Sequence, residues 1–396
     1  MALLAKIEYA GANEGSFQQA AEALRRLAEM PISAKHVQRI AERLGRERVA
    51  ERDRDVERLK GGKLAPKHVQ PPAVAAIHVD AGKVQLRAEE GGPGVRQPRW
   101  ADTKVGCLLT CSAPTGDGDP QPEPPALFLD RPEVMRLCQE MNEVRSDPTT
   151  RPGSRGAPKV LKGSPTALPA HATRLVRTAV ATTQGTEAFG WMVAAEATRR
   201  GFYEAPRRAL VGDGGNWIEP LGQMHFPGWV QVLDFLHLLV HLYAAATAAH
   251  RREGKRAWSL YARMLRAAWA GRAELVQATL RRELERLGPP SPDAPADAPA
   301  KVLARTLAYV EKNAQRMNYP QYRRQGLPVT SAAVESLIKQ FNRRIKGTEK
   351  FWRQGGVESV LQSRAAYLSD DGRGEAFYSR RPRARAAGSH RLRRVA

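Results

Sequence analysis

The sequence predicts an α/β protein built on a mixed β-sheet, with a helical unit before the sheet and another inserted near its end. Three observations support this fold class. An amphipathic helical stretch precedes the first apolar strands. Strands with short connections then follow one another, which is typical of antiparallel pairing. Between residues 185 and 250, strands and helices alternate, and this order favours parallel strands joined by crossover helices.

The first 62 residues are predicted to be helical. "FQQAAEALRRLAE", which begins at Phe17, places its apolar side chains on one helical face, and a second amphipathic helix carries Val37 and Leu44. Ser33 is the expected N-cap of the second helix. Two helices joined by a tight turn resemble a helix-turn-helix unit that binds DNA. Because basic and acidic residues nearly balance here, a plain helical hairpin is the alternative interpretation.

Three strands are predicted after a linker at 60–72. "AVAAIHVD" ends at Asp80, "KVQLRA" follows a short turn that contains Gly82, and "TKVGCLLTCS" is the third. The helix "RPEVMRLCQEMNEV" lies between segments rich in Pro and Gly at 113–125 and 146–158, and "TRLVRTAVATT" adds a further strand. This order indicates an antiparallel meander.

The next part alternates between strand and helix. The helix "GTEAFGWMVAAEATRRG" is followed by a strand ending at Asp213, the helix "NWIEPLGQMHF", the strand "GWVQVLDF" and a helix over about 237–250. Further helices are expected at 255–287, 301–318 and 331–346. A meander followed by parallel units is the order of an RNase H-like fold. The expected division is a helical unit at 1–62, the first part of the RNase H-like core at 70–250, an all-α insertion at 251–325, the final core helix at 326–370 and a basic disordered tail at 371–396.

The charge balance favours a polyanionic partner. The chain has 396 residues, with 63 Lys and Arg against 41 Asp and Glu, which gives a formal charge of +22. An Arg-rich composition from a GC-rich genome is the alternative explanation. The three cysteines are odd in number and lack paired spacing, which argues against a disulfide framework or a zinc site. Because no secretory signal or long apolar run is present, we expect a cytoplasmic protein without membrane association.

Acidic residues end two of the apolar strands. Asp80 and Asp213 are each followed within two residues by glycine. In an open sheet, ligands gather where strands end, so both carboxylates are expected to face one cleft. A turn role explains either residue alone. Glu335 lies on the last helix beside its apolar stripe. With Ser331 as N-cap, Glu335 falls one position too late for a reciprocal capping box, although it would still favour the positive end of the helix.

Three carboxylates are suited to phosphoryl transfer. Mg²⁺ prefers oxygen ligands in octahedral geometry and keeps waters and substrate phosphates in its coordination shell. Two Mg²⁺ or Mn²⁺ ions would activate the attacking oxygen and stabilise the leaving one. Histidine-rich ligation would indicate zinc instead.

Three stretches resemble the DDE transposases of bacterial insertion sequences, most closely the ISKra-type group. They are "HVDAGKVQLR", "LVGDGGNWIEPLGQMHFPGWVQVLDFLHLLVHLY" and "GLPVTSAAVESLIKQFNRRIKGTEKFW". The resemblance covers about residues 70–112 and 185–370. Its most specific parts are Asp-Gly-x-x-Trp, which begins at Asp213, and the following Asp-Phe-x-His. Residues 113–170 match the group poorly.

The resemblance implies an RNase H-like domain that binds two divalent ions, cuts DNA at transposon ends and joins the freed 3′ hydroxyl to target DNA. It implies that Asp80, Asp213 and Glu335 are the metal ligands. It also implies that the chain forms a homodimer or higher oligomer on DNA. "LDFLH" looks like the Cys/Asp-x-x-His element of related transposases, here Asp234 and His237. Our hypothesis is that His237 positions a phosphate or water near the metals; a buried Asp and His that join strand to helix are the alternative.

Two other functions fit the same features: an RNase H-like nuclease that cuts without joining, and a DNA-binding protein derived from a transposase that has lost catalysis. In each case DNA is the expected partner. A basic stripe follows Glu335 along the last helix and beyond, where it would track the DNA backbone, although a solvated helix face is the alternative. The residues expected to contact DNA are Arg323, Arg324, Lys339, Arg343, Arg344, Lys346, Lys350 and Arg353.

Overall fold

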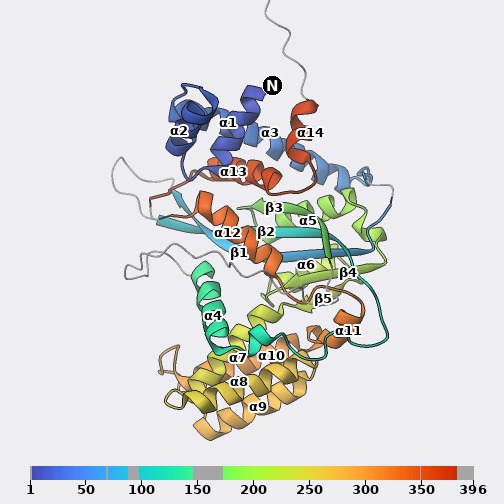
Figure 1. Cartoon of the computed structure of the whole chain (residues 1–396), viewed down its shortest axis with the longest axis vertical. Coiled ribbons are helices and arrows are strands. Elements are labelled where there is room, and N and C mark those ends of the chain that lie inside the picture. Colours follow the sequence, from blue (N-terminus) through green and yellow to red (C-terminus); the bar gives the residue numbers. More distant parts are fainter. Residues whose placement is uncertain (1, 68–69, 88–97, 146–172, 348, 381–396) are drawn as a thin grey trace, which may run out of the picture.

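The protein is an α/β protein with a mixed five-stranded sheet. The computed structural model describes residues 2–67, 70–87, 98–145, 173–347 and 349–380. The strand order is β3-β2-β1-β4-β5, in which β1 pairs antiparallel with β2, β2 antiparallel with β3, and β1, β4 and β5 run parallel (Figure 1). The strands are β1 (Val74–Arg87), β2 (Pro98–Ser112), β3 (Thr173–Thr182), β4 (Arg207–Gly212) and β5 (Val230–Leu233).

β1 is one long strand, so the predicted break around Gly82 is wrong. Ala81 pairs with Lys104 and Gly82 with Thr103, and the ladder continues to Arg87. The reason is the length of β2, which offers a partner to every residue of β1 and satisfies its backbone groups without a turn. Asp80 therefore lies within a strand. It does, however, follow the last residue of β1 that pairs with β4.

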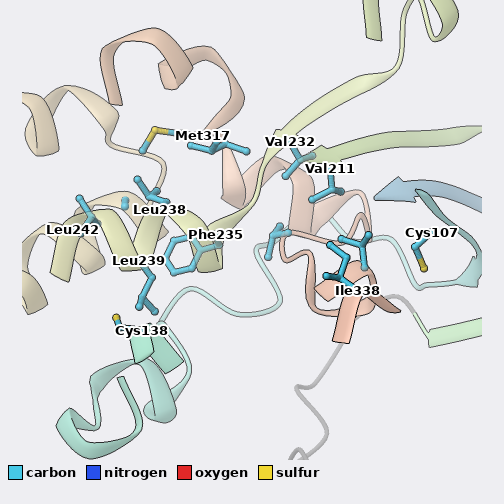
Figure 2. Packing of buried hydrophobic residues seen from close by; sticks show 14 of the residues in the cluster. Cys107, Cys138, Val211, Val232, Phe235, Leu238, Leu239, Leu242, Met317 and Ile338 are labelled. Atoms are coloured by element: carbon cyan, nitrogen blue, oxygen red, sulfur yellow. The ribbon is translucent and has the colours of Figure 1, made fainter. Parts of the chain in front are cut away.

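Two apolar clusters cover the two faces of the sheet. Along β1, Ala75, Ile77 and Val79 face a cluster formed with α5 (Thr186–Arg199) and α6 (Ile218–His225). The alternate residues face a larger cluster that includes α7 (Phe235–Ala249) and α12 (Ala332–Ile345). Figure 2 shows this larger cluster, with Phe235, Leu238, Leu239 and Leu242 of α7 on one side and Val211, Val232 and Ile338 on the other.

The region between α7 and α12 is helical, as the sequence predicts, but its divisions differ. The predicted helix at 255–287 is two helices, because Gly271 has a positive φ of 72° and ends the first of them. The predicted helix at 301–318 ends at Asn313 as an α-helix. The helices are α8 (Gly254–Trp269), α9 (Ala273–Leu287), α10 (Pro299–Asn313) and α11 (Tyr319–Arg324), with a short 3-10 helix at Ala314–Arg316.

Helices from both ends of the chain pack together beside the sheet (Figure 1). Ser16 and Ser33 are the N-caps of α2 and α3, and each side chain accepts a backbone amide. The sequence analysis expected 1–62 to be helical but placed no separate helix before Phe17, and it did not predict α13 or the length of α3. These helices are α1 (Ala2–Asn13), α2 (Phe17–Ala28), α3 (Ala34–Lys60), α13 (Gln354–Tyr367) and α14 (Arg373–Ser379).

The expected disordered tail at 371–396 is wrong in its first part, because 373–379 form α14. Phe377 and Tyr378 of this helix are buried against Leu44 of α3, and that burial orders the segment. Residues 381–396 lie outside the described residues. The remaining elements are α4 (Arg131–Arg145), which was predicted, and 3-10 helices at Ala126–Leu129 and Phe202–Glu204. In the described part of the chain, every helix is too short or too polar to cross a bilayer.

Candidate metal centre

Two carboxylates and an imidazole meet on the face of the sheet that α7 and α12 cover. One ligand atom each from Asp80, His237 and Glu335 lies within 4.8 Å of the others. The side chains are buried, with exposed fractions of 4%, 3% and 8%. Two carboxylates that share a buried site repel each other unless a positive charge lies between them. The composition and spacing of this group therefore fit a cation site.

Asp80 and Glu335 come together because α12 packs closely on β1. A Cβ atom on Gly82 would lie 2.8 Å from Oγ1 of Thr103 and 3.6 Å from the Ile338 side chain of α12. Glycine at this position therefore leaves room for the Thr103 side chain of β2, whereas a Cβ atom would make only ordinary van der Waals contact with α12. Gly82 shares a strand with Asp80, and Ile338 lies one turn after Glu335. The glycine therefore fits the close pairing of β1 with β2, where the sequence indicated a turn.

Asp234 links the two helices that carry His237 and Glu335. It follows β5, and its Oδ2 accepts the backbone amide of His237 at 3.0 Å as the N-cap of α7. Its Oδ1 accepts the amide of Ser331, which precedes α12, at 2.5 Å. Burial raises the pKa of Asp234, but the hydrogen bonds to His237 and Ser331 and the attraction to His237 outweigh it, so the pKa lies below its ordinary value. Asp234 is thus a buried carboxylate that fixes the starts of two helices.

The same carboxylate orients His237. Nδ1 of the imidazole lies 2.5 Å from Oδ2 of Asp234, and Nε2 lies 3.3 Å from Oε1 of Glu335. When Nδ1–H donates to Asp234, the lone pair of Nε2 faces Asp80 and Glu335, which is the arrangement found for histidines that ligate metals. The sequence-based alternative, a buried Asp and His that join strand to helix, describes Asp234 well. His237 has the further contact with Glu335.

Replacing Asp234 with Asn tests this orienting role. Both oxygens of Asp234 accept backbone amides, so the amide nitrogen of Asn faces a donor in either orientation, and the negative charge that holds Nδ1–H of His237 is lost. We expect Asp234→Asn to weaken Mn²⁺ binding by about 10–100-fold, measured by electron paramagnetic resonance of free Mn²⁺. Asp130→Asn, at the exposed residue before α4 whose carboxylate accepts the amide of Glu133, is the control. Equal Mn²⁺ affinity in the two variants would rule out the orienting role.

Asp213 lies next to the group but is not a member of it within the 4.8 Å limit. Asp213 follows Gly212, and Gly212 pairs with Val79 of β1. Asp213 and Asp80 are therefore the residues directly after the last pair of two neighbouring parallel strands. Its Oδ1 accepts the amide of Gly215 at 2.9 Å. The sequence prediction of Asp80, Asp213 and Glu335 as the ligand set thus differs from the geometry, in which His237 is the third member.

Helix α10 holds the loop that carries Asp213. The Tyr309 hydroxyl donates to the carbonyl of Asp213 at 2.9 Å, and Nζ of Lys312 donates to the carbonyl of Gly214 at 3.2 Å. Gly214 has a φ of 79°, and a Cβ atom there would lie 2.9 Å from Asn313. Glycine is therefore required by both conformation and space. The sequence analysis missed these contacts, because nothing in the pattern of α10 points to this loop.

His78 is a further buried polar residue on the same face, and the sequence analysis also missed it. It lies two residues before Asp80 on β1, and neither ring nitrogen has a hydrogen-bond partner within the described part of the chain. Burial lowers its pKa to about 4, opposed by the charge of Asp234. The ring is therefore neutral at pH 7. The alternation of side chains along a strand was the available signal, since it places positions 78 and 80 on one face.

Comparisons with known proteins add no identification. No protein-family model matches the chain, and no curated protein matches it either.

The residues expected to contact DNA fall into two groups. Arg323 is 3% exposed and pairs with Asp119 at 2.5 Å, and Arg344 is 2% exposed, with its guanidinium over the rings of Phe17 and Trp352. Burial lowers the pKa of Arg344 to about 10. Both guanidinium groups are thus engaged inside the protein. The other residues are exposed or half-buried: Arg324, Lys339, Arg343, Lys346, Lys350 and Arg353.

Two lysines of the second group already have partners. Nζ of Lys339 lies 2.9 Å from a carboxylate oxygen of Glu140 on α4. Nζ of Lys350 donates to the carbonyls of Arg343 and Arg344 at 3.1 and 3.2 Å, at the end of α12. Arg324, Arg343 and Arg353 are exposed, as is Lys339. For these cations, a basic stripe near the metal centre stays a prediction. The buried Arg323 and Arg344 instead stabilise the fold.

Proposed function

We propose that this chain is a DNA transposase that uses divalent metal ions to cut transposon ends and join them to target DNA. The observation that carries the proposal is the buried group of Asp80, His237 and Glu335 beside Asp213. The strand order 3-2-1-4-5, with helices on both faces, supports an RNase H-like catalytic domain. The helices between α7 and α12 correspond to the insertion that the resemblance implies.

The donor set fits Mg²⁺ or Mn²⁺. Carboxylate oxygens suit both ions, and an imidazole beside them favours Mn²⁺ more than Mg²⁺. Asp80 and Glu335 would hold the first ion with His237, and Asp213, on the neighbouring strand end, would supply a ligand to the second. When bound, such ions activate the attacking oxygen and stabilise the leaving oxygen of a phosphodiester.

The protein's own groups provide position and environment. Asp234 fixes the imidazole of His237 and the start of α12, so the carboxylate of Glu335 is held before substrate arrives. Burial of the three side chains keeps bulk water away, which strengthens electrostatic interactions with a phosphate. The exposed arginines near α12 would bind the DNA backbone and align the scissile bond.

A cleavage and joining assay tests the proposal. The substrate is a duplex that carries the inverted repeats expected beside the gene. We expect nicking at the repeat end with Mg²⁺ or Mn²⁺ and none with EDTA, followed by joining of the 3′ end to a target plasmid. Nicking without joining would support the nuclease alternative, and binding without nicking would support the non-catalytic one. Either result would contradict the proposed function.

His237→Ala tests the histidine separately. Removal of the imidazole takes away a group that faces both carboxylates, so we expect the cleavage rate to fall by about 10–100-fold and the Mn²⁺ concentration needed for half-maximal rate to rise. His250→Ala, which removes an imidazole 3.6 Å from Glu283 at the end of α7, is the control. An unchanged rate and an unchanged metal dependence in His237→Ala would exclude a role for this residue.

A further inference from the structure

The outer face of α8 is basic along its whole length. Lys255, Arg263 and Arg266 are exposed, and with the exposed Ser259 they follow spacings of four, four and three residues. Such spacings place side chains on one face of a helix. The opposite face is buried, with Leu260, Tyr261, Met264, Leu265 and Trp269 in the core. We call the three cations Lys255, Arg263 and Arg266 the α8 basic face.

The α8 basic face has no internal counter-charge. The helix contains no acidic residue, and within the described ranges no ion pair or hydrogen bond involves the side chains of its three cations. Three other cations of the same helical unit are paired. Arg256 lies 2.8 Å from Glu253, Arg286 lies 2.9 Å from Glu283, and Arg281 pairs with Glu311. The cations of the α8 basic face differ from these three in that their charge is available to an outside partner.

A cation from another element extends the face. Arg131 is the exposed first residue of α4. A guanidinium nitrogen of Arg131 would lie 3.1 Å from a Cβ atom placed on Gly254. Gly254 is the first residue of α8. The positive charge therefore continues past the start of the helix. Its span from Lys255 to Arg266 is about 16 Å at 1.5 Å per residue.

We propose that the α8 basic face binds the phosphate backbone of duplex DNA, at a place separate from the metal centre. A span of about 16 Å covers about five base pairs at 3.4 Å per pair, so the three cations can contact phosphates of one strand within that stretch. Exposed side chains that carry charge and no base-specific geometry suit backbone contacts rather than sequence readout. This proposal rests on the proposed function for one point only, the identification of the bound polyanion as DNA.

An anionic membrane fits this face less well. A helix that lies on a bilayer inserts an apolar face, and the apolar face of α8 is buried against α7 and α9 in the protein core. The helical insertion also lies across the sheet from α1, α2 and α3 (Figure 1). DNA held at the sheet and at α8 would therefore contact a part of the protein distant from the N-terminal helices.

The test is the salt dependence of DNA binding by the full chain in EDTA, measured with a 30-base-pair duplex of arbitrary sequence. Each phosphate contact contributes about 0.9 to the slope of log K against log salt. We expect the triple variant Lys255→Gln, Arg263→Gln, Arg266→Gln to reduce this slope by about 2.7. The control triple Arg256→Gln, Arg281→Gln, Arg286→Gln changes the net charge by the same amount but removes paired cations, so its slope should change much less.

Equal slopes in the two triple variants would overturn the proposal, because the effect would then reflect net charge alone. Loss of binding to vesicles rich in phosphatidylserine, with DNA binding unchanged, would also overturn it in favour of a membrane surface. The metal-dependent nicking assay separates this inference from the proposed function. Nicking with equal slopes refutes only the α8 surface, whereas a reduced slope without nicking refutes only the enzyme.

Discussion

Asp80→Ala and Glu335→Ala are each expected to abolish metal-dependent DNA cleavage. The two carboxylates are buried together with His237, so loss of either removes a ligand oxygen from the site. Removal of outer-shell partners of metal sites already costs about 10–100-fold. We therefore expect less than about 1% of the parent rate. The measurement is single-turnover nicking of the repeat-end duplex in Mn²⁺, together with DNA affinity in EDTA.

The control is Asp102→Ala, which removes an exposed carboxylate of β2 that lies 3.3 Å from Lys83. It should leave the cleavage rate unchanged. Affinity in EDTA should be retained in all three variants, because phosphate contacts are made by cations elsewhere. Full activity in Asp80→Ala or Glu335→Ala would refute the assignment of the catalytic centre.

Glu8→Ala is expected to destabilise the fold more than any surface change. Glu8 on α1 is fully buried. Its carboxylate accepts hydrogen bonds from Nε and Nη2 of Arg48 on α3 at 2.7 and 3.0 Å. It also accepts the Ser363 hydroxyl of α13 at 2.6 Å and the hydroxyl of Tyr378 on α14. Removing one partner of a buried ion pair leaves a buried charge, which costs about 3–5 kcal/mol. Urea denaturation monitored by circular dichroism measures this loss.

The same carboxylate predicts a pH dependence. Burial raises the pKa of Glu8, but its hydrogen bonds and its attraction to Arg48 outweigh this, so the folded pKa lies below the ordinary value of 4.5. A depressed pKa gives stability that is present above pH 4.5 and lost as the pH falls through the folded pKa. Glu8→Ala should therefore lose part of the acid sensitivity of the parent. Glu274→Ala, at an exposed residue of α9, is the control, and an equal effect of both substitutions would contradict the prediction.

Much of the fold could be predicted because its signals are local. The helices at 131–144 and 331–346 follow apolar periodicity and match α4 and α12 to within one residue. The predicted cap Ser33 precedes an apolar run, and its side chain accepts an amide hydrogen bond. The alternation of strand and helix after residue 185 correctly indicated the parallel part of the sheet.

Other features depend on contacts between distant segments. Gly82 was interpreted as a turn, but β2 pairs through it and α12 packs beside it. α13 and the separate helix α1 were not predicted, because the hydrogen-bond donors to Glu8 and the burial of Arg344 exist only after both chain ends meet. In the candidate site, Asp80 and Glu335 were foreseen from sequence. His237 joins the group because Asp234 orients its imidazole. Asp234 is in turn held by the amide of Ser331 at the start of α12.

Anomalous diffraction from crystals grown with Mn²⁺ tests the central claim most directly. We predict a peak coordinated by oxygens of Asp80 and Glu335 and by Nε2 of His237 at roughly 2.0–2.2 Å, with a second peak beside Asp213 once DNA is bound. A crystal that contains Mn²⁺ elsewhere but has a direct hydrogen bond from His237 to Glu335 and no peak between the carboxylates would contradict the account.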